Sequence, residues 1–151
     1  MNKIAIFIVS LAGLGFLKPM PGTYASLATF LVAYPLAGYF NLTTAALIFL
    51  LLLLVSHRAI KTAILNEVNQ DPAWIVIDEV LGVMLIVVLI PWSITAWLAA
   101  FILFRLFDAF KIWPVNIFDK IKTPFGVIAD DLTAGAMTVI IIKLLAWANI
   151  F

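Results

Sequence analysis

Two adjacent carboxylates stand at the start of a long apolar run in this chain. Asp130 and Asp131 occur in "GVIADDLTAG", directly before "AMTVIIIKLLAW". A second acidic pair, Asp78 and Glu79, occurs in "IDEVLGVMLIV", and Asp108 closes a third apolar run. Carboxylates contributed by separate segments can exchange protons with a substrate or hold a hard divalent cation.

The composition shows what kind of chain surrounds these acids. Of its 151 residues, 66% are hydrophobic and 11% are charged, whereas soluble domains carry about 25% charged residues. The net charge of +1 indicates no nucleic-acid partner. The absence of cysteine excludes disulfides, thiolate catalysis and thiolate metal sites. The chain therefore reads as a single membrane-embedded domain over residues 1–151.

The apolar runs predict an all-α, multi-span membrane bundle, because lipid leaves every backbone hydrogen bond to be made within the chain. Spanning helices need roughly 20 apolar residues. The expected elements are spans at 24–40, 42–56, 74–91, 93–110 and 126–148, a short or re-entrant segment at 4–17, an amphipathic cytoplasmic helix at 57–72 and a loop at 111–125. The stripe of Ile60, Ile64, Leu65 and Val68 indicates the amphipathic helix.

The basic residues predict the orientation of the spans. The segments 13–23, 57–73 and 105–125 carry most of the Lys and Arg residues, whereas the connections at 41–42 and 91–93 carry no charge. The positive-inside rule places the three basic segments in the cytoplasm. The same topology brings five acids to one depth on three helices: Asp78, Glu79, Asp108, Asp130 and Asp131.

Five carboxylates at the membrane boundary need a counter-charge, because a charge inside a span costs at least about 2.5 kcal/mol. Arg105 and Lys111 flank Asp108 on one helical stripe but are too few to balance them. With oxygen donors and only one His, Mg²⁺ is the expected cation, with Mn²⁺ or Ca²⁺ as alternatives. The plainer alternative is that the acids only form ion pairs with Arg105 and nearby lysines.

The turn "KPMPGTYAS" predicts a second feature on the same side. Thr23 is the expected N-cap of the following helix, and Ser26 lies at its third position. Free N–H groups at Gly22 and beyond, two hydroxyls and Lys18 would together suit an anion. A helix start that is merely capped is the alternative interpretation.

Four segments together resemble one known family. "GLGFLKPMPGTYASL", "DPAWIVIDEVLGV", "FRLFDAFKIWPVNIFDK" and "GVIADDLTAG" are similar to the phosphatidylglycerophosphatase A family, in the same order and over most of the chain. The resemblance implies a Mg²⁺-dependent lipid phosphatase of the bacterial inner membrane. It would hydrolyse phosphatidylglycerophosphate to phosphatidylglycerol and inorganic phosphate on the cytoplasmic side.

The charges suggest roles within that reaction. Mg²⁺ held by Glu79, Asp108 and one or both of Asp130 and Asp131 would polarise the phosphate. Lys18, Lys111 and Arg105 would hold its remaining oxygens. The nucleophile is either a water activated at the metal, with Asp78 or Asp131 as its base, or an aspartate that becomes phosphorylated.

Two alternative functions stay open on sequence grounds. Intramembrane carboxylates also occur in cation transporters and channels, and a lipid phosphatase can act on another phosphomonoester. The small residues in "AGAMT" would seat a neighbouring helix, so a homo-oligomer is also an expectation.

Overall fold

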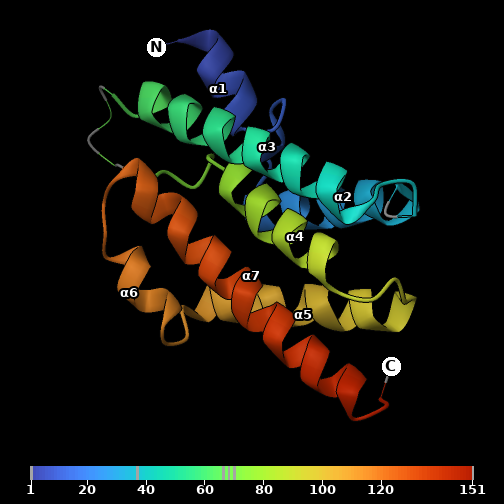
Figure 1. The fold of residues 1–151 in the computed structure, drawn as a ribbon. Helices are drawn as coiled ribbons and strands as arrows, with labels where there is room; N and C mark the ends of the chain where they lie inside the picture. Colours follow the sequence, from blue (N-terminus) through green and yellow to red (C-terminus); the bar gives the residue numbers. More distant parts are fainter. Residues whose placement is uncertain (1, 37, 66, 68, 70, 151) are drawn as a thin grey trace.

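The protein is all-helical throughout the part that the structure describes. This computed structural model describes residues 2–36, 38–65, 67, 69 and 71–150. Seven α-helices and one 3₁₀ helix follow one another in these residues (Figure 1). They are α1 (Lys3–Val9), η1 (Leu14–Phe16), α2 (Pro21–Leu36), α3 (Leu42–Ala63), α4 (Ile77–Leu89), α5 (Ile94–Phe110), α6 (Val115–Asp119) and α7 (Pro124–Trp147).

Local sequence signals fix where the longest helices begin. The Asn41 side chain accepts a hydrogen bond from the Thr44 amide at 2.8 Å and caps α3. Thr123 accepts one from the Gly126 amide at 3.2 Å and caps α7. Pro124 occupies the first turn of α7, where its missing N–H costs nothing.

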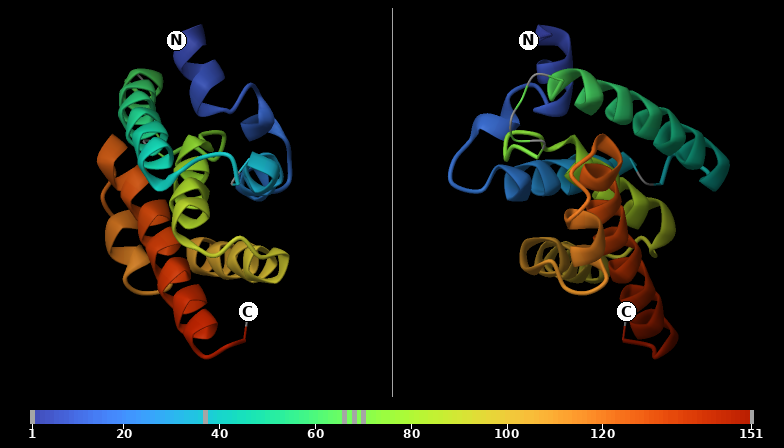
Figure 2. Two further views of the ribbon diagram at one scale, coloured as in Figure 1. Left: turned by 45° about the vertical axis from the view of Figure 1, so that its right-hand side comes forward. Right: turned by 90° about the vertical axis from the view of Figure 1, so that its left-hand side faces the viewer.

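Helix α4 lies at the centre of the bundle. It packs against α2, α3 and α7, and α7 in turn packs on α5 and α6. The C-terminal part of α3 and the N-terminal part of α7 lie side by side in every view (Figures 1 and 2). This arrangement brings the first turns of α4 and α7 together with the end of α5.

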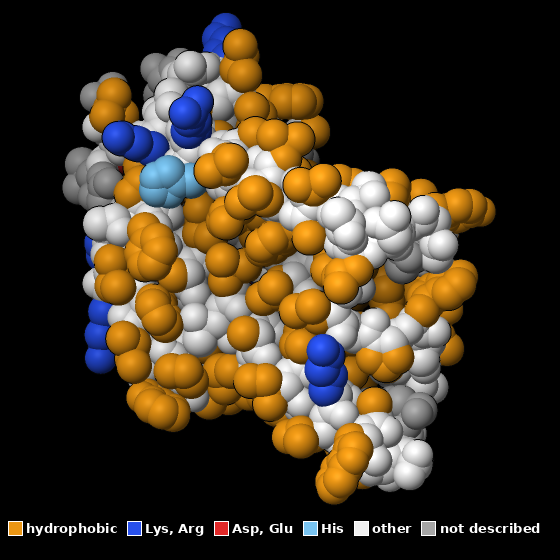
Figure 3. Space-filling model, in the orientation of Figure 1, with side chains coloured by type: hydrophobic (Ala, Val, Ile, Leu, Met, Phe, Trp, Pro, Cys, Tyr) orange, Lys and Arg blue, Asp and Glu red, His pale blue; other side chains and the backbone are white. Residues whose placement is uncertain are grey.

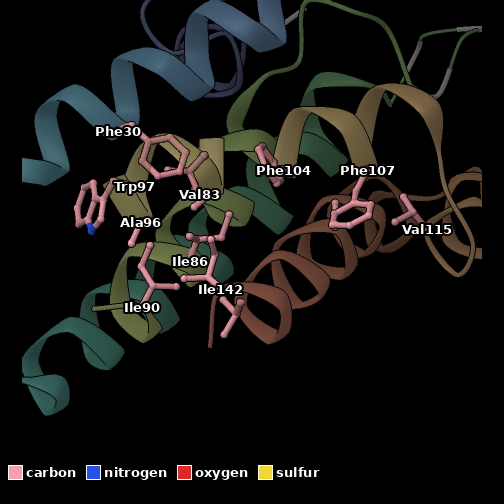
Figure 4. Close-up of a cluster of buried hydrophobic side chains, with 13 residues drawn as sticks. Phe30, Val83, Ile86, Ile90, Ala96, Trp97, Phe104, Phe107, Val115 and Ile142 are labelled. Carbon is pink, nitrogen blue, oxygen red and sulfur yellow. The ribbon is translucent and has the colours of Figure 1, made fainter. Parts of the chain in front are cut away.

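Two apolar cores hold the helices in place. One gathers Phe30, Ile86, Phe104 and Ile142 between α2, α4, α5 and α7 (Figure 4). The other gathers Val9, Ile60 and Leu81 between α1, α3 and α4. Both cores include residues close in sequence to the acids of α4 and α7, such as Leu81 and Ala134.

Two helices, α3 and α7, are long and apolar enough to cross a membrane. Helices α2, α4 and α5 have 16, 13 and 17 residues, which is short of the roughly 20 that a perpendicular span needs. The expected helical bundle is therefore confirmed, whereas the five separate spans are supported only for α3 and α7.

The prediction of a separate amphipathic helix at 57–72 is wrong. Helix α3 continues without a break to Ala63, and Ile60 and Ile64 are buried against α1 and α4 rather than lying on a membrane surface. Leu65 is exposed, and Val68 lies outside the described residues. The segment 4–17 divides into α1 and η1, and α6 interrupts the expected loop at 111–125.

Candidate functional site

Helices α4 and α7 cross at two glycines, and this crossing brings their acids together. A Cβ atom added to Gly135 would lie 2.7 Å from the Gly82 carbonyl oxygen. One added to Gly82 would lie 2.9 Å from the Asp131 carbonyl oxygen. Only glycine allows the backbones of α4 and α7 to come this close. The small residues of "AGAMT" therefore pack against α4 of the same chain.

Three carboxylates from the two helices meet beside this crossing. One oxygen from each of Asp78, Glu79 and Asp131 lies within 4.8 Å of the others. Asp78 and Asp131 are only 7% and 3% exposed, so water screens their mutual repulsion weakly. We call these three residues the acidic triad.

The acidic triad has the donor chemistry of a site for a hard cation. Glu79 Oε2 and Asp131 Oδ1 are buried and have no hydrogen-bond partner within the described part of the chain. Buried polar atoms are normally paired, and an unpaired one needs an explanation. A divalent cation bound by oxygen ligands provides one, so the residues present fit a metal such as Mg²⁺.

Asp108 and Asp130 lie beside the triad and engage the basic residues. Arg105 Nη1 donates to Asp108 Oδ2 at 2.6 Å. Lys111 Nζ donates to Asp108 Oδ1 at 2.9 Å and to Asp130 Oδ2 at 2.7 Å. The ammonium of Lys111 therefore joins the end of α5 to the first turns of α7.

Lys111 reaches this position through an unusual backbone conformation. It is the C-cap of α5 and has φ 47° and ψ 47°, in the left-handed region that costs an ordinary residue roughly 1–2 kcal/mol. Burial lowers the pKa of its ammonium, but the carboxylates of Asp108 and Asp130 outweigh burial and raise that pKa well above the ordinary value. Lys111 thus remains a cation.

The start of α2 closes the site from a third side. Gly22 packs directly on the Glu79 carboxylate, in contact that leaves no room for a Cβ atom. Ser26 Oγ donates to the Gly22 carbonyl at 2.7 Å and accepts from Arg105 Nη1 at 3.3 Å. Arg105 is thereby held between Ser26 and Asp108.

The structure corrects the expected N-cap role of Thr23, whereas the phosphate-binding role expected for Lys18 stays a prediction. Helix α2 begins at Pro21, so Thr23 lies inside the first turn and is not the N-cap. Its buried Oγ1 has no hydrogen-bond partner among the described residues. Lys18 is exposed. It is not among the described residues that line the polar pocket between α2, α4, α5 and α7.

A polar pocket of about 230 Å³ unites these groups. Its lining contains all five acids that the sequence singled out, both basic residues that flank Asp108, and the start of α2. The lining residues are Met20, Pro21, Gly22, Asp71, Ala73, Ile75, Asp78, Glu79, Arg105, Asp108, Lys111, Asp130 and Asp131.

Two further acids near the pocket escaped the sequence reasoning. Asp71 lines the pocket and lies 3.8 Å from Lys122. Asp119, on α6, lies 3.8 Å from Lys111 Nζ. Asp71 is the first residue of "DPAWIVIDEVLGV", one of the four segments that carry the family resemblance, so the sequence could have indicated it as a site residue. The position of Asp119 depends on the packing of α6 against α7, which the sequence does not show.

The arrangement joins an acidic half to a basic half. The triad can hold a cation and accept a proton, whereas Arg105 and Lys111 can bind the oxygens of an anion. A phosphate group placed between the halves would meet both. This geometry suits the transfer of a phosphoryl group more directly than it suits the passage of ions, because the charges gather in one pocket.

Comparison with known proteins gives a consistent result. Residues 7–146 match the family described as Phosphatidylglycerophosphatase A. A protein named Phosphatidylglycerophosphatase A from Haemophilus influenzae is 32% identical, over 94% of this chain and 88% of its own length. One of the same name from Escherichia coli is 28% identical, over 83% of this chain and 74% of its own length.

A third relative carries a different name. A Bacteroides thetaiotaomicron protein named "Putative phosphatidylinositol-3-phosphatase" is 32% identical, over 89% of both chains. No solved structure matches this chain.

Proposed function

Because the chain belongs to the phosphatidylglycerophosphatase A family, it is a lipid phosphatase, and we propose that its substrate is phosphatidylglycerophosphate. The products would be phosphatidylglycerol and inorganic phosphate. The observation that carries this proposal is the pocket that sets the acidic triad against Arg105 and Lys111.

We propose Mg²⁺ as the cofactor. Asp78, Glu79 and Asp131 would hold it, because their oxygens lie together and two of them lack hydrogen-bond partners among the described residues. When bound, Mg²⁺ supplies positive charge that offsets the negative charge developing on the phosphoryl group. Asp108 and Asp130, expected from the sequence as further ligands, already accept hydrogen bonds from the basic residues, and we propose that they position those residues.

Arg105 and Lys111 would bind the phosphate oxygens of the substrate. Charge-assisted hydrogen bonds to a phosphate are about twice as strong as neutral ones. Gly22 and Thr23 lie in the first turn of α2, where N–H groups have no partner within the helix, and a helix N-terminus favours an anion. The Thr23 hydroxyl has no partner among the described residues. Thr23 does not line the polar pocket, so its hydroxyl would reach the phosphate only if the start of α2 shifted on binding.

Hydrolysis requires a nucleophile and a base. In the mechanism that we favour, the oxygen of a water molecule attacks phosphorus while Asp78 or Asp131 takes its proton. The ester P–O bond breaks, and the leaving glycerol oxygen receives a proton. The alternative is direct attack by one of these aspartates, which would form a phosphorylated enzyme that water then hydrolyses.

We propose that the chain works as one domain, residues 1–151, embedded in the bacterial inner membrane with its site at the cytoplasmic face. Helix α3 supports this because only 17% of its most apolar 18-residue stretch is buried inside the protein. Hydrophobic side chains dominate one face of the molecule, and Lys and Arg side chains lie mostly along its upper and left margins (Figure 3). The chain is proposed to pass through the membrane more than once.

A substrate panel tests the proposed activity. Purified protein would be assayed for phosphate release from phosphatidylglycerophosphate, phosphatidic acid and phosphatidylinositol 3-phosphate in identical mixed micelles with Mg²⁺. We expect the first lipid to give the highest kcat/KM. Preference for the third would favour the activity in the name of the Bacteroides relative, and cation flux in liposomes without any phosphate release would favour a transporter.

A further inference from the structure

A second, larger cavity lies along the same helices as the polar pocket. It is an apolar groove of about 660 Å³ between α2, α3 and α4. We call it the apolar groove. Its walls include Val32 and Leu36 from α2, Ala45 and Ile48 from α3, and Met84 and Val88 from α4.

The packing of the helices explains why this groove exists. Helices α2 and α3 both pack on α4, but they make few contacts with each other in the described residues. They form two walls above a floor made by α4 (Figure 2). The side chains that line an unfilled groove lack van der Waals contacts on one side. An apolar ligand would supply those contacts and so would bind favourably.

The lining offers a ligand no free polar group. Thr29 supplies the single hydroxyl side chain among the lining residues of the described chain, and its Oγ1 donates to the Ala25 carbonyl of its own helix at 2.8 Å. A ligand with its own hydrogen-bonding groups would leave them unpaired here, at a cost of about 1–3 kcal/mol each. The groove therefore suits a hydrocarbon.

The linings of the polar pocket and of the groove include adjacent residues of α4. Glu79 lines the polar pocket, and the next residue, Val80, lines the groove. On α2, Gly22 lines the pocket and Ala28 lines the groove. From Val80 to Val88 the floor runs for about 12 Å along α4, so a chain attached to a headgroup in the pocket would have a path leading away from it.

We propose that the apolar groove binds one acyl chain of the lipid substrate while the phosphate occupies the polar pocket. This inference rests on the proposed function, because it assigns the hydrocarbon part of the same substrate. Holding the chain would fix the headgroup relative to the acidic triad, and such orientation lowers the barrier of the reaction. A bilayer solvates straight and branched chains alike, whereas a groove of fixed width distinguishes them.

An internal competition tests the proposal. Two phosphatidylglycerophosphates with the same headgroup, one with palmitoyl and one with methyl-branched phytanoyl chains, would be mixed equally in the same vesicles. Mass spectrometry of the two products gives the ratio of kcat/KM, which does not depend on how much enzyme is active. We expect the protein to prefer palmitoyl chains by about tenfold, the usual discrimination of an apolar pocket.

Two neighbouring alanines provide matched variants. Ala45→Trp fills the groove, so it should bring the ratio close to unity and slow turnover of the palmitoyl lipid. Ala46→Trp adds the same ring on the exposed side of α3 and should keep the preference of the unsubstituted protein. Equal use of both lipids by the unsubstituted protein, or the same ratio in both variants, would overturn the proposal.

A labelling experiment on the unsubstituted protein decides the case in which Ala45→Trp does not fold. A phosphatidylglycerophosphate with a diazirine in one acyl chain would be photolysed and its adducts mapped. We expect adducts at groove residues such as Met84 and Val88; adducts confined to outward residues such as Leu47 and Leu51 would mean that only bulk lipid is contacted. Phosphate release from neither lipid would contradict the proposed function itself, whereas release without chain preference contradicts the groove alone.

Discussion

Asp131 is the residue at which the proposed chemistry converges. It lies 3% exposed at the crossing of α4 and α7, and one of its oxygens has no hydrogen-bond partner in the described chain. Its carboxylate would hold the cation or accept the proton of the attacking water. An amide in its place keeps the shape of the side chain and removes the charge from the acidic triad.

We predict that Asp131→Asn lowers kcat by about two to four orders of magnitude, the usual contribution of a positioned acid–base group. The melting temperature should not fall, because the change removes one of several crowded negative charges. Glu67→Gln is the control, since it also removes one carboxylate charge and Glu67 is not among the residues that line the polar pocket. Unchanged turnover in Asp131→Asn would remove Asp131 from the site.

Lys111 provides the second prediction at this scale. Lys111→Met removes the ammonium that joins Asp108 to Asp130 and leaves both buried carboxylates short of a partner. We expect the free energy of unfolding to fall by about 2 kcal/mol. This is less than the roughly 3–5 kcal/mol lost when one partner of a fully buried ion pair is removed, because Lys111 is partly exposed. We also expect a higher KM for the lipid. Chemical denaturation and steady-state kinetics measure the two effects.

The matched control for Lys111 is Lys122→Met. Lys122 is 56% exposed and lies 3.8 Å from Asp71, so its loss should change the free energy of unfolding by less than about 1 kcal/mol. If both variants behaved alike, Lys111 would be an ordinary surface lysine and not a link between α5 and α7.

At the scale of the elements, the glycine crossing of α4 and α7 decides whether the acidic triad can form. A methyl group at Gly135 would meet the backbone of α4, which cannot move aside as a side chain can. We predict that Gly135→Ala costs about 1–3 kcal/mol in stability, as overpacking does, and lowers activity by separating Asp131 from Asp78 and Glu79.

Ala136→Val provides the comparison for that change. Ala136 is the next residue on α7 and is exposed, so a larger addition there should alter stability by less than about 0.5 kcal/mol. Thermal unfolding in detergent and phosphate release would be measured on both variants. A Gly135→Ala protein as stable and active as Ala136→Val would show that the crossing of α4 and α7 can accommodate a methyl group at residue 135.

The sequence was sufficient to predict that Asp78, Glu79, Asp108, Asp130 and Asp131 meet, because each lies near an end of an apolar helical run that the predicted topology places on one side of the membrane. All five line one pocket. The helical class followed for the same reason, since long apolar runs without alternation favour helices.

Tertiary packing determined what the sequence could not show. The stripe containing Ile60 is equally consistent with a helix on a membrane surface and with the buried face of a longer helix, and contact with α1 and α4 decides for the latter. The left-handed conformation of Lys111 is locally unfavourable, so no local rule predicts it. The division of acids between the triad and the ion pairs likewise depends on distances between helices.

At the scale of the whole molecule, the placement in the membrane makes a prediction of its own. The chain has no cysteine, so single cysteines can report on which side a residue lies. We expect Lys122→Cys, just before α7, to react with an impermeant maleimide only in opened membranes. Ala148→Cys, just after α7, should react from outside intact spheroplasts, because α7 with 24 residues is long enough to separate them.

Reaction of both cysteines from the same side would contradict a spanning α7 and leave this helix as a buried core element. The labelling distinguishes these two cases because 61% of the most apolar 18-residue stretch of α7 is buried inside the protein, as it also would be in a core helix. Activity of both variants on phosphatidylglycerophosphate would show that the cysteines report on the native arrangement.

The central claim is that carboxylates from α4 and α7 meet in order to hold a divalent cation for phosphate-ester hydrolysis. Its most direct test is phosphate release from phosphatidylglycerophosphate by the purified protein during titration with a chelator and then with Mg²⁺. We predict that activity disappears in excess chelator, returns with Mg²⁺, and does not return in Asp131→Asn. Full activity of the unsubstituted protein in excess chelator would contradict the account.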